Sequence, residues 1–294
     1  MPDAPVAPEA VRRVAERVPP HAYFVVSAVF HYLGPAFAVL LFARLDPLGV
    51  AWLRIGVAAA IFAAWRRPWR TWRFLDPASR RLVVGWGCVL AVMNACFYLA
   101  IDRLALGTVA AIEFVPVIVL AAVASRTGRN VVALLLAVAG VYLLTDVHLG
   151  GEPVGLAFAA VNAALFAAYI VLGHRVARSP AMSGIDGLAL AMVVAAVAAL
   201  PLGLAQATPA YTDPVVLAAA VGVGISSSVI PYVCDQLAMA RLNRGTYALL
   251  VSLLPATATV IGIVVLTQVP APIEVVGVLS IVAAVAVHRE AGVR

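Results

Sequence analysis

Lysine is absent from this chain, and charged residues of any kind are scarce. All 20 basic residues are arginines, and charged residues occupy only 12% of the 294 positions. So few charges cannot cover the surface of a soluble globule of this size, which excludes a soluble enzyme domain. The arginine excess gives a net charge of +6. Without a folded polar face it does not form a nucleic-acid surface, so no nucleic acid is expected and lipid headgroups are the expected partner.

Signatures of metal sites and enzymes are missing as well. The three cysteines, Cys88, Cys96 and Cys234, lie in apolar segments without CxxC spacing. This pattern indicates small buried side chains rather than a metal or redox site. The sequence has no HExxH, no phosphate-binding loop and no G-x-S-x-G. We therefore predict that the protein is not an enzyme and holds no metal and no cofactor.

Apolar residues, in contrast, make up 64% of the chain, and the mean hydropathy is +1.03. They form runs of roughly 17–22 residues, the length that crosses a bilayer as a helix. We predict an all-α polytopic membrane protein between a cytoplasmic leader (1–21) and a cytoplasmic tail (289–294). The ten predicted transmembrane helices cover 22–42, 47–65, 82–101, 106–124, 130–146, 153–173, 184–204, 213–233, 246–267 and 272–288.

The positions of the arginines predict the orientation of these helices. With the N-terminus inside, 17 of the 20 arginines fall on the cytoplasmic side. Arg44 and Arg103 fall outside, and Arg54 lies within a helix. This is a strong positive-inside bias, so both termini are expected in the cytoplasm. The Arg- and Trp-rich stretch from Trp65 to Phe74 is predicted to be an interfacial ribbon at headgroup level.

The two halves of the chain resemble each other weakly. Residues 106–116 and 245–255 both begin near a Gly-Thr pair and reach a proline about three turns later. This match places residues 22–146 over residues 153–288, with five helices in each. An odd number of spans inverts the second copy, and inverted repeats with broken helices are typical of secondary transporters. Helix breaks are predicted at four prolines: Pro35, Pro116, Pro231 and Pro255.

Three polar residues are predicted at one depth, where lipid hydrocarbon would otherwise be. Arg54 and Glu113 each lie about seven residues from the outer end of their helices, and Asn94 lies at a similar level. Buried charges usually pair, so one interpretation is a structural ion pair between Arg54 and Glu113. The alternatives are a direct role in binding substrate or carrying protons, and separate orientations of the two side chains.

Other polar residues within the apolar runs carry two interpretations each. His31 is either a hydrogen-bonded core residue or a proton carrier, and Asn162 bonds either a ligand or a neighbouring helix. The segment from Gly222 to Ser228, which includes Ser227, either exposes polar groups to a cavity or forms a close-packing face. Three tyrosines are candidates for lining a substrate path: Tyr98, Tyr169 and Tyr232. For Tyr98, the alternative is an interfacial anchor.

Several stretches resemble the EamA branch of the drug/metabolite transporter superfamily, and within it the threonine/homoserine exporters. They are Tyr32 to Phe42 followed by Pro47 to Arg54, then Asn94 to Pro116 with its Ala-Ile-Glu-Phe core, and Tyr247 to Thr259 leading to Gln268-Val-Pro. The resemblance implies ten spans in two inverted halves, a bacterial inner-membrane location and efflux of amino acids or related metabolites. It also implies use of the proton gradient, and it equates Glu113 and Arg54 with the family's acid and its arginine. Pro35 stands where a small residue is expected.

We therefore expect a transporter that exports a small polar molecule, such as threonine or homoserine, by alternating access with proton coupling. One alternative is efflux of another cargo, such as a cationic drug. Another is a membrane scaffold that transports nothing. The sequence carries no signal for an oligomeric state.

Overall fold

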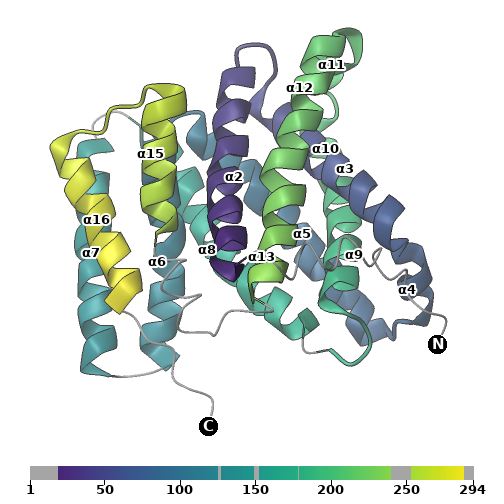
Figure 1. Cartoon of the computed structure of the whole chain (residues 1–294), viewed down its shortest axis with the longest axis horizontal. Coiled ribbons are helices and arrows are strands. Elements are labelled where there is room, and N and C mark those ends of the chain that lie inside the picture. Colours follow the sequence, from purple (N-terminus) through teal and green to yellow (C-terminus); the bar gives the residue numbers. More distant parts are fainter. Residues whose placement is uncertain (1–18, 125–126, 149–151, 178, 240–252, 288–294) are drawn as a thin grey trace.

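The structure, a computed structural model, describes residues 19–124, 127–148, 152–177, 179–239 and 253–287, and in these ranges every regular element is a helix (Figure 1). The helices are α2 (Pro20–Leu41), α3 (Pro47–Arg66), α4 (Pro68–Phe74), α5 (Pro77–Ile101), α6 (Leu106–Ala124), α7 (Gly128–His148), α8 (Pro153–Ala177), α9 (Gly184–Ala198), α10 (Leu200–Gly203), α11 (Thr208–Thr212), α12 (Pro214–Gly224), the π-helical segment η1 (Ile225–Val229), α13 (Ile230–Met239), α15 (Leu254–Leu266) and α16 (Pro272–Val287). The predicted tail, nearly all of the predicted leader and residues 246–252 lie outside the described residues.

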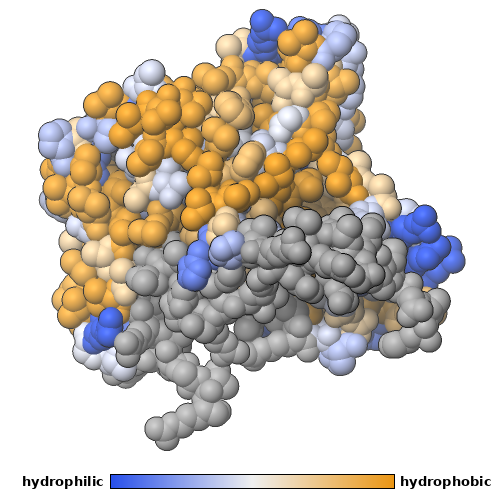
Figure 2. Space-filling view, viewed as in Figure 1, coloured by the Kyte–Doolittle hydropathy of each residue, from blue (hydrophilic) through white to orange (hydrophobic). Residues whose placement is uncertain are grey.

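The described helices confirm an all-helical membrane protein. Five stretches are long and apolar enough to cross a bilayer, and five shorter apolar helices accompany them. The five long stretches are His21–Leu41, Pro47–Arg66, Pro77–Ile101, Pro153–Gly173 and Pro214–Cys234. Hydrophobic residues cover most of the face shown in Figure 2, which suits contact with lipid tails.

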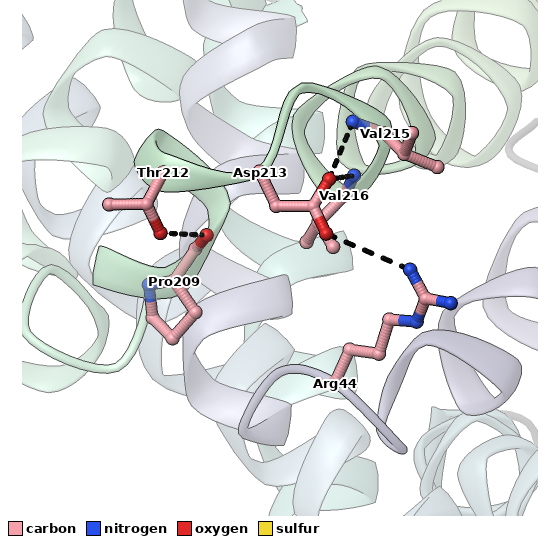
Figure 3. A network of polar contacts seen from close by, with 6 residues as sticks. All are labelled: Arg44, Pro209, Thr212, Asp213, Val215 and Val216. Carbon is pink, nitrogen blue, oxygen red and sulfur yellow. Dashed lines mark hydrogen bonds and ion pairs between the residues drawn. The ribbon is translucent and has the colours of Figure 1, made fainter.

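An Asp-Pro pair starts three of these helices. The side chains of Asp46, Asp76 and Asp213 accept hydrogen bonds from backbone amides of the first turn of α3, α5 and α12. Proline in the first turn has no amide that needs a partner, so the pair both caps and preorganises the helix start. Figure 3 shows Asp213 bound to the amides of Val215 and Val216, with the Arg44 guanidinium 3.7 Å from its second carboxylate oxygen.

Three predicted boundaries differ from the structure for local reasons. The stretch after Arg66, predicted as a ribbon, contains the helix α4, which Pro68 starts. The predicted helix 184–204 is divided at Ala199, because Pro201 has no amide for the carbonyl of Val197. The predicted helix 213–233 continues through η1 to Met239.

Close glycine contacts join the helices. A Cβ atom on Gly34 in α2 would collide with the backbone of Ser227 in η1, and one on Gly49 in α3 would collide with the backbone of Gln206. α5 packs along α8, α7 along α16, and α2 along α13. Small residues that allow close backbone approach are the usual basis of helix packing in membranes.

Candidate functional site

Arg54, near the middle of α3, is the centre of a buried polar cluster. Its Nε donates to Ser228 Oγ at 2.9 Å, its Nη1 to Asn94 Oδ1 at 2.6 Å, and its Nη2 to the Ser227 carbonyl at 2.9 Å. Only 6% of the arginine is exposed. Asn94 Nδ2 in turn donates to the Leu90 carbonyl at 2.9 Å, which fixes the orientation of the amide. The cluster therefore satisfies a buried guanidinium with neutral acceptors from α5 and η1.

The π-helical segment η1 makes this arrangement possible. Its wider turn lets the Ile230 amide bond the Ile225 carbonyl, five residues back. The Ser227 carbonyl faces Arg54, while the Ser227 hydroxyl donates to the Val223 carbonyl. Single π turns of this kind are common at functional sites. The Gly-Ser-rich segment singled out in the sequence thus contributes both a packing face and a polar contact.

Tyrosines surround the arginine. The Tyr98 ring lies 5.6 Å from the Arg54 guanidinium, in the geometry of a cation–π contact. Tyr32, which the sequence analysis did not single out, is 1% exposed and meets His31 edge-on at 5.2 Å. The Tyr32 hydroxyl is buried without a hydrogen-bond partner in the part of the chain that the structure describes. The Tyr98 hydroxyl lies close to the side chains of Arg54 and Ser227.

Glu113 pairs with an amide and not with Arg54. Asn162 Nδ2 in α8 donates to Glu113 Oε1 in α6 at 3.1 Å. The interpretation of Arg54 and Glu113 as a direct ion pair is wrong, because the two side chains, both described, form no ion pair with each other in the structure. Glu113 is 7% exposed and Asn162 fully buried, and the amide oxygen of Asn162 has no partner among the described residues.

An aromatic row continues from this pair along α8. Asn162, Phe166 and Tyr169 recur at helical spacing, so they share one face of α8. Phe166 meets Phe114 at 5.9 Å between ring centroids, and Tyr169 stacks on Trp86 at 5.4 Å. Tyr169 is thus a packing residue between α8 and α5. Tyr232, in α13, packs against the same core cluster as Trp86.

The four predicted prolines differ in their surroundings. Pro35 and Pro116 lie inside α2 and α6, and neither ends its helix. Pro231 lies in the first turn of α13, where its carbonyl accepts from the Ser27 hydroxyl. Pro255 lies in the first turn of α15. Residues 240–252, which precede this helix, are outside the described part of the chain.

Sequence reasoning gave no role to Tyr32, because a tyrosine within an apolar run is common and carries no charge that needs explaining. It named the segment that ends at Ser228, but not Ser228 as a partner of Arg54. It also missed the buried Glu274, whose Oε2 accepts from the Ala271 amide at 2.7 Å at the start of α16. That bond is a helix cap, so Glu274 belongs to the framework.

The fold and the cluster define a class of protein: a helical membrane protein with a charged, hydrogen-bonding interior. The EamA-like transporter family matches residues 153–288. The threonine/homoserine exporter RhtA of Escherichia coli strain K12 is 32% identical over 85% of this chain and 84% of its own. The exporter of the same name from Salmonella typhimurium strain LT2 is 31% identical with the same coverage. The chain belongs to the EamA-like transporter family.

A solved structure agrees in fold. A crystal structure of a protein aligns with a TM-score of 0.55, covering 90% of this chain and 96% of that one at 20% identity. Similarity at this identity concerns the arrangement of helices alone.

Proposed function

We propose that this protein is a secondary active transporter that exports small polar metabolites, with amino acids such as threonine and homoserine as substrates, by alternating access coupled to protons. It would lie in the bacterial inner membrane, with ten spans and both termini in the cytoplasm. The relatives are threonine/homoserine exporters, and the interior of this chain suits that cargo.

One observation carries the proposal: two sets of polar contacts at the site join the first half of the chain to the second. Glu113 in α6 binds Asn162 in α8, and Arg54 in α3 binds Ser227 and Ser228 in η1. Any movement of one half against the other must therefore break or rearrange these hydrogen bonds. Alternating access requires this kind of coupling between the site and the interface.

The polar groups of the site suit a zwitterion. An amino acid carries an ammonium, a carboxylate and, in threonine or homoserine, a hydroxyl. The Glu113 carboxylate is an acceptor for an ammonium, and the Arg54 guanidinium is the cation for a carboxylate. The Asn162 amide oxygen is a further acceptor for a substrate hydroxyl.

Proton coupling is proposed at Glu113. Its hydrogen-bond partner is a neutral amide and not a counter-ion. Protonation therefore makes the buried side chain neutral and leaves no opposite charge unpaired. Competition between a proton and a substrate ammonium for one carboxylate would exchange the two across the membrane.

Reciprocal contacts support two inverted repeats. Gly87 in α5 packs against Val194 of α9, and Gly224 in α12 packs against Val57 of α3. Gly87 and Gly224 are 137 positions apart (224 − 87), and Val57 and Val194 are separated by the same step (194 − 57). Each contact is therefore the counterpart of the other.

The contact between α7 and α16 repeats the pattern and supports inversion. Gly140 packs against Ile281, and Gly277 packs against Leu144, again with a step of 137 positions (277 − 140). The contacts ascend in α7 while they descend in α16, so the two helices run antiparallel. A two-fold axis that reverses the helix direction generates such a pair.

The matched glycines allow a stringent test of this interface. Gly87→Ala and Gly224→Ala should each destabilise the detergent-purified protein by about 1–3 kcal/mol, because the new methyl group overlaps Val194 or Val57. The controls, Gly85→Ala and Gly222→Ala, have no atom within 4 Å of the new Cβ. They should leave thermal stability unchanged or slightly raised. Equal melting temperatures for all four variants would contradict the reciprocal packing.

The proposed topology is tested by cysteine labelling in a background without the three native cysteines. Glu152, Thr212 and Arg70 are exposed. Cysteines at Glu152 and Thr212 should react with an impermeant thiol reagent on intact cells, whereas one at Arg70 should react only after permeabilisation. Labelling of all three from one side would refute the ten-span topology.

The function itself is tested in everted membrane vesicles. Labelled threonine or homoserine should enter when the lumen is made acidic, and a panel of unlabelled amino acids should compete. Uptake of a cationic dye alone would favour the alternative cargo. No uptake of any compound, with a correctly folded protein, would favour the non-transporting scaffold.

A further inference from the structure

The short helix α4 is fixed to the protein by one face. Arg67, which precedes it, adopts a left-handed conformation (φ 50°, ψ 58°), so the chain turns sharply where α3 ends. Pro68 is buried, Trp72 packs against the core cluster around Phe62, and α4 contacts α9. Leu75, directly after the helix, is also buried. The orientation of α4 is therefore set by packing.

The opposite face of α4 combines aromatic rings and guanidinium groups. Trp69 lies one turn before Arg73, and Arg70 lies one turn before Phe74, so each ring neighbours a charge on the helix surface. Trp69 is 52% exposed and Phe74 is 89% exposed. Rings exposed to this extent beside arginines are typical of helices that lie in the headgroup region of a bilayer.

The surroundings of α4 are strongly positive. Six arginines lie between positions 66 and 81, and Asp76 is the only acid in that range. Its carboxylate already accepts from the Ala78 and Ser79 amides. The hydrogen bond with Ser79 lowers the pKa of Asp76, so the cap stays ionised at neutral pH and weakens only as the pH falls through that lowered pKa. Figure 2 shows hydrophilic residues gathered at the right-hand edge, over the region where Figure 1 labels α4.

The side chain of Arg80 lies against α4, next to Arg73. The Arg80 guanidinium stacks over the Trp72 ring at 5.3 Å, and its Nη2 is 3.5 Å from the Arg73 carbonyl. Its Nε is buried and has no hydrogen-bond partner among the described residues. Arg66, in contrast, is occupied by Asp186, with Nε and Nη2 both 2.9 Å from one carboxylate oxygen. Arg73 and Arg80 form no ion pair within the described part of the chain.

We propose that α4 and the first turn of α5 form a binding site for the headgroup of an anionic phospholipid in the leaflet that α4 meets. Arg73 and Arg80 bind the lipid phosphate, since guanidinium groups match phosphate oxygens. The exposed rings of Trp69 and Phe74 contact the glycerol and the upper acyl chain. The arginines and the exposed aromatic rings share one face of the helix. This combination favours a lipid over a soluble anion, because a soluble anion has no apolar part for the rings to contact.

The test compares the purified protein in nanodiscs of phosphatidylcholine with added phosphatidylglycerol. Brominated phosphatidylglycerol should quench tryptophan fluorescence at lower mole fraction than brominated phosphatidylcholine. The double variant Arg73→Gln with Arg80→Gln should bind phosphatidylglycerol about tenfold more weakly or worse, from the loss of two arginine–headgroup contacts. The control, Arg44→Gln with Arg103→Gln, removes the same charge at the ends of α3 and α5 opposite to α4, and should bind as the wild type does.

Two further measurements keep the test decisive. The variant Arg73→Lys with Arg80→Lys keeps the charge and should retain part of the preference, even if the glutamine variant folds poorly. Inorganic phosphate, used as a competitor, should not displace the lipid at equal concentration. Equal binding by the two glutamine doubles, or full displacement by phosphate, would overturn the proposal. Because the readout is binding, its failure is distinct from a failure of transport.

Discussion

Glu113→Gln should abolish gradient-driven export while leaving the protein folded. The amide oxygen of glutamine can accept the same hydrogen bond from Asn162. Among the described residues no cation forms an ion pair with Glu113, so loss of its charge leaves no cation unpaired. The free energy of unfolding should therefore change by less than about 1 kcal/mol. Accumulation against a gradient should disappear, because glutamine cannot take up a proton. Uptake in everted vesicles and detergent melting temperatures, measured on the same preparations, check both parts.

Two comparisons sharpen this result. In a structural ion pair, Glu113→Gln would strand Arg54 and cost about 3–5 kcal/mol, and Arg54→Gln would restore part of the loss. The geometry, in which no ion pair joins the two described side chains, instead predicts a coupling energy well below that of a buried ion pair. Wild-type export by Glu113→Gln under an imposed proton gradient would refute the coupling role.

Arg54→Leu should be the most destabilising single change in the site. It leaves the Asn94 amide oxygen, the Ser228 hydroxyl and the Ser227 carbonyl without their common donor. An unsatisfied buried acceptor costs about 1–3 kcal/mol, partly offset because a buried charge is also removed, so we expect a net loss of about 2–4 kcal/mol. Thermal unfolding in detergent, with transport assayed in parallel, measures it.

Matched variants separate the arginine's geometry from its charge. Arg54→Lys retains the charge, but one ammonium cannot reproduce the planar fork that reaches three acceptors, so most of the loss should persist. Adding Asn94→Leu to Arg54→Leu removes one orphaned acceptor and should recover part of the stability. A melting temperature unchanged in Arg54→Leu would contradict the central position of this residue.

Much of the fold was readable from local chemistry. The predicted starts at Pro47 and Pro153 match α3 and α8, because prolines after a turn mark helix beginnings unambiguously. Apolar run length identified the remaining helices, and composition alone excluded a soluble protein. The helix α4 was missed because it is only seven residues long and its apolar stripe, Pro68, Trp72 and Leu75, is interrupted by arginines. Packing against α9 and the proline start stabilise it.

The site was predicted in its members but not in its pairing. Rise per residue gives the depth of a side chain, and it correctly grouped Arg54 and Asn94, which are in direct contact. Depth does not give the direction in which a side chain leaves its helix. That direction sends Arg54 toward η1 and Glu113 toward Asn162. The π turn itself has no sequence signature beyond a run of small residues.

The antiparallel contact between α7 and α16 has the form of an isologous interface, the self-complementary surface of a two-fold dimer. Gly140 contacts Ile281, which lies one turn after Gly277, and Gly277 contacts Leu144, which lies one turn after Gly140. Under the proposed inverted repeat, the same step of 137 positions relates the polar site to its counterpart in the other half. The position equivalent to Arg54 (191 − 54) is Ala191. The proposed repeat would therefore bury one guanidinium, where two identical halves would bury two.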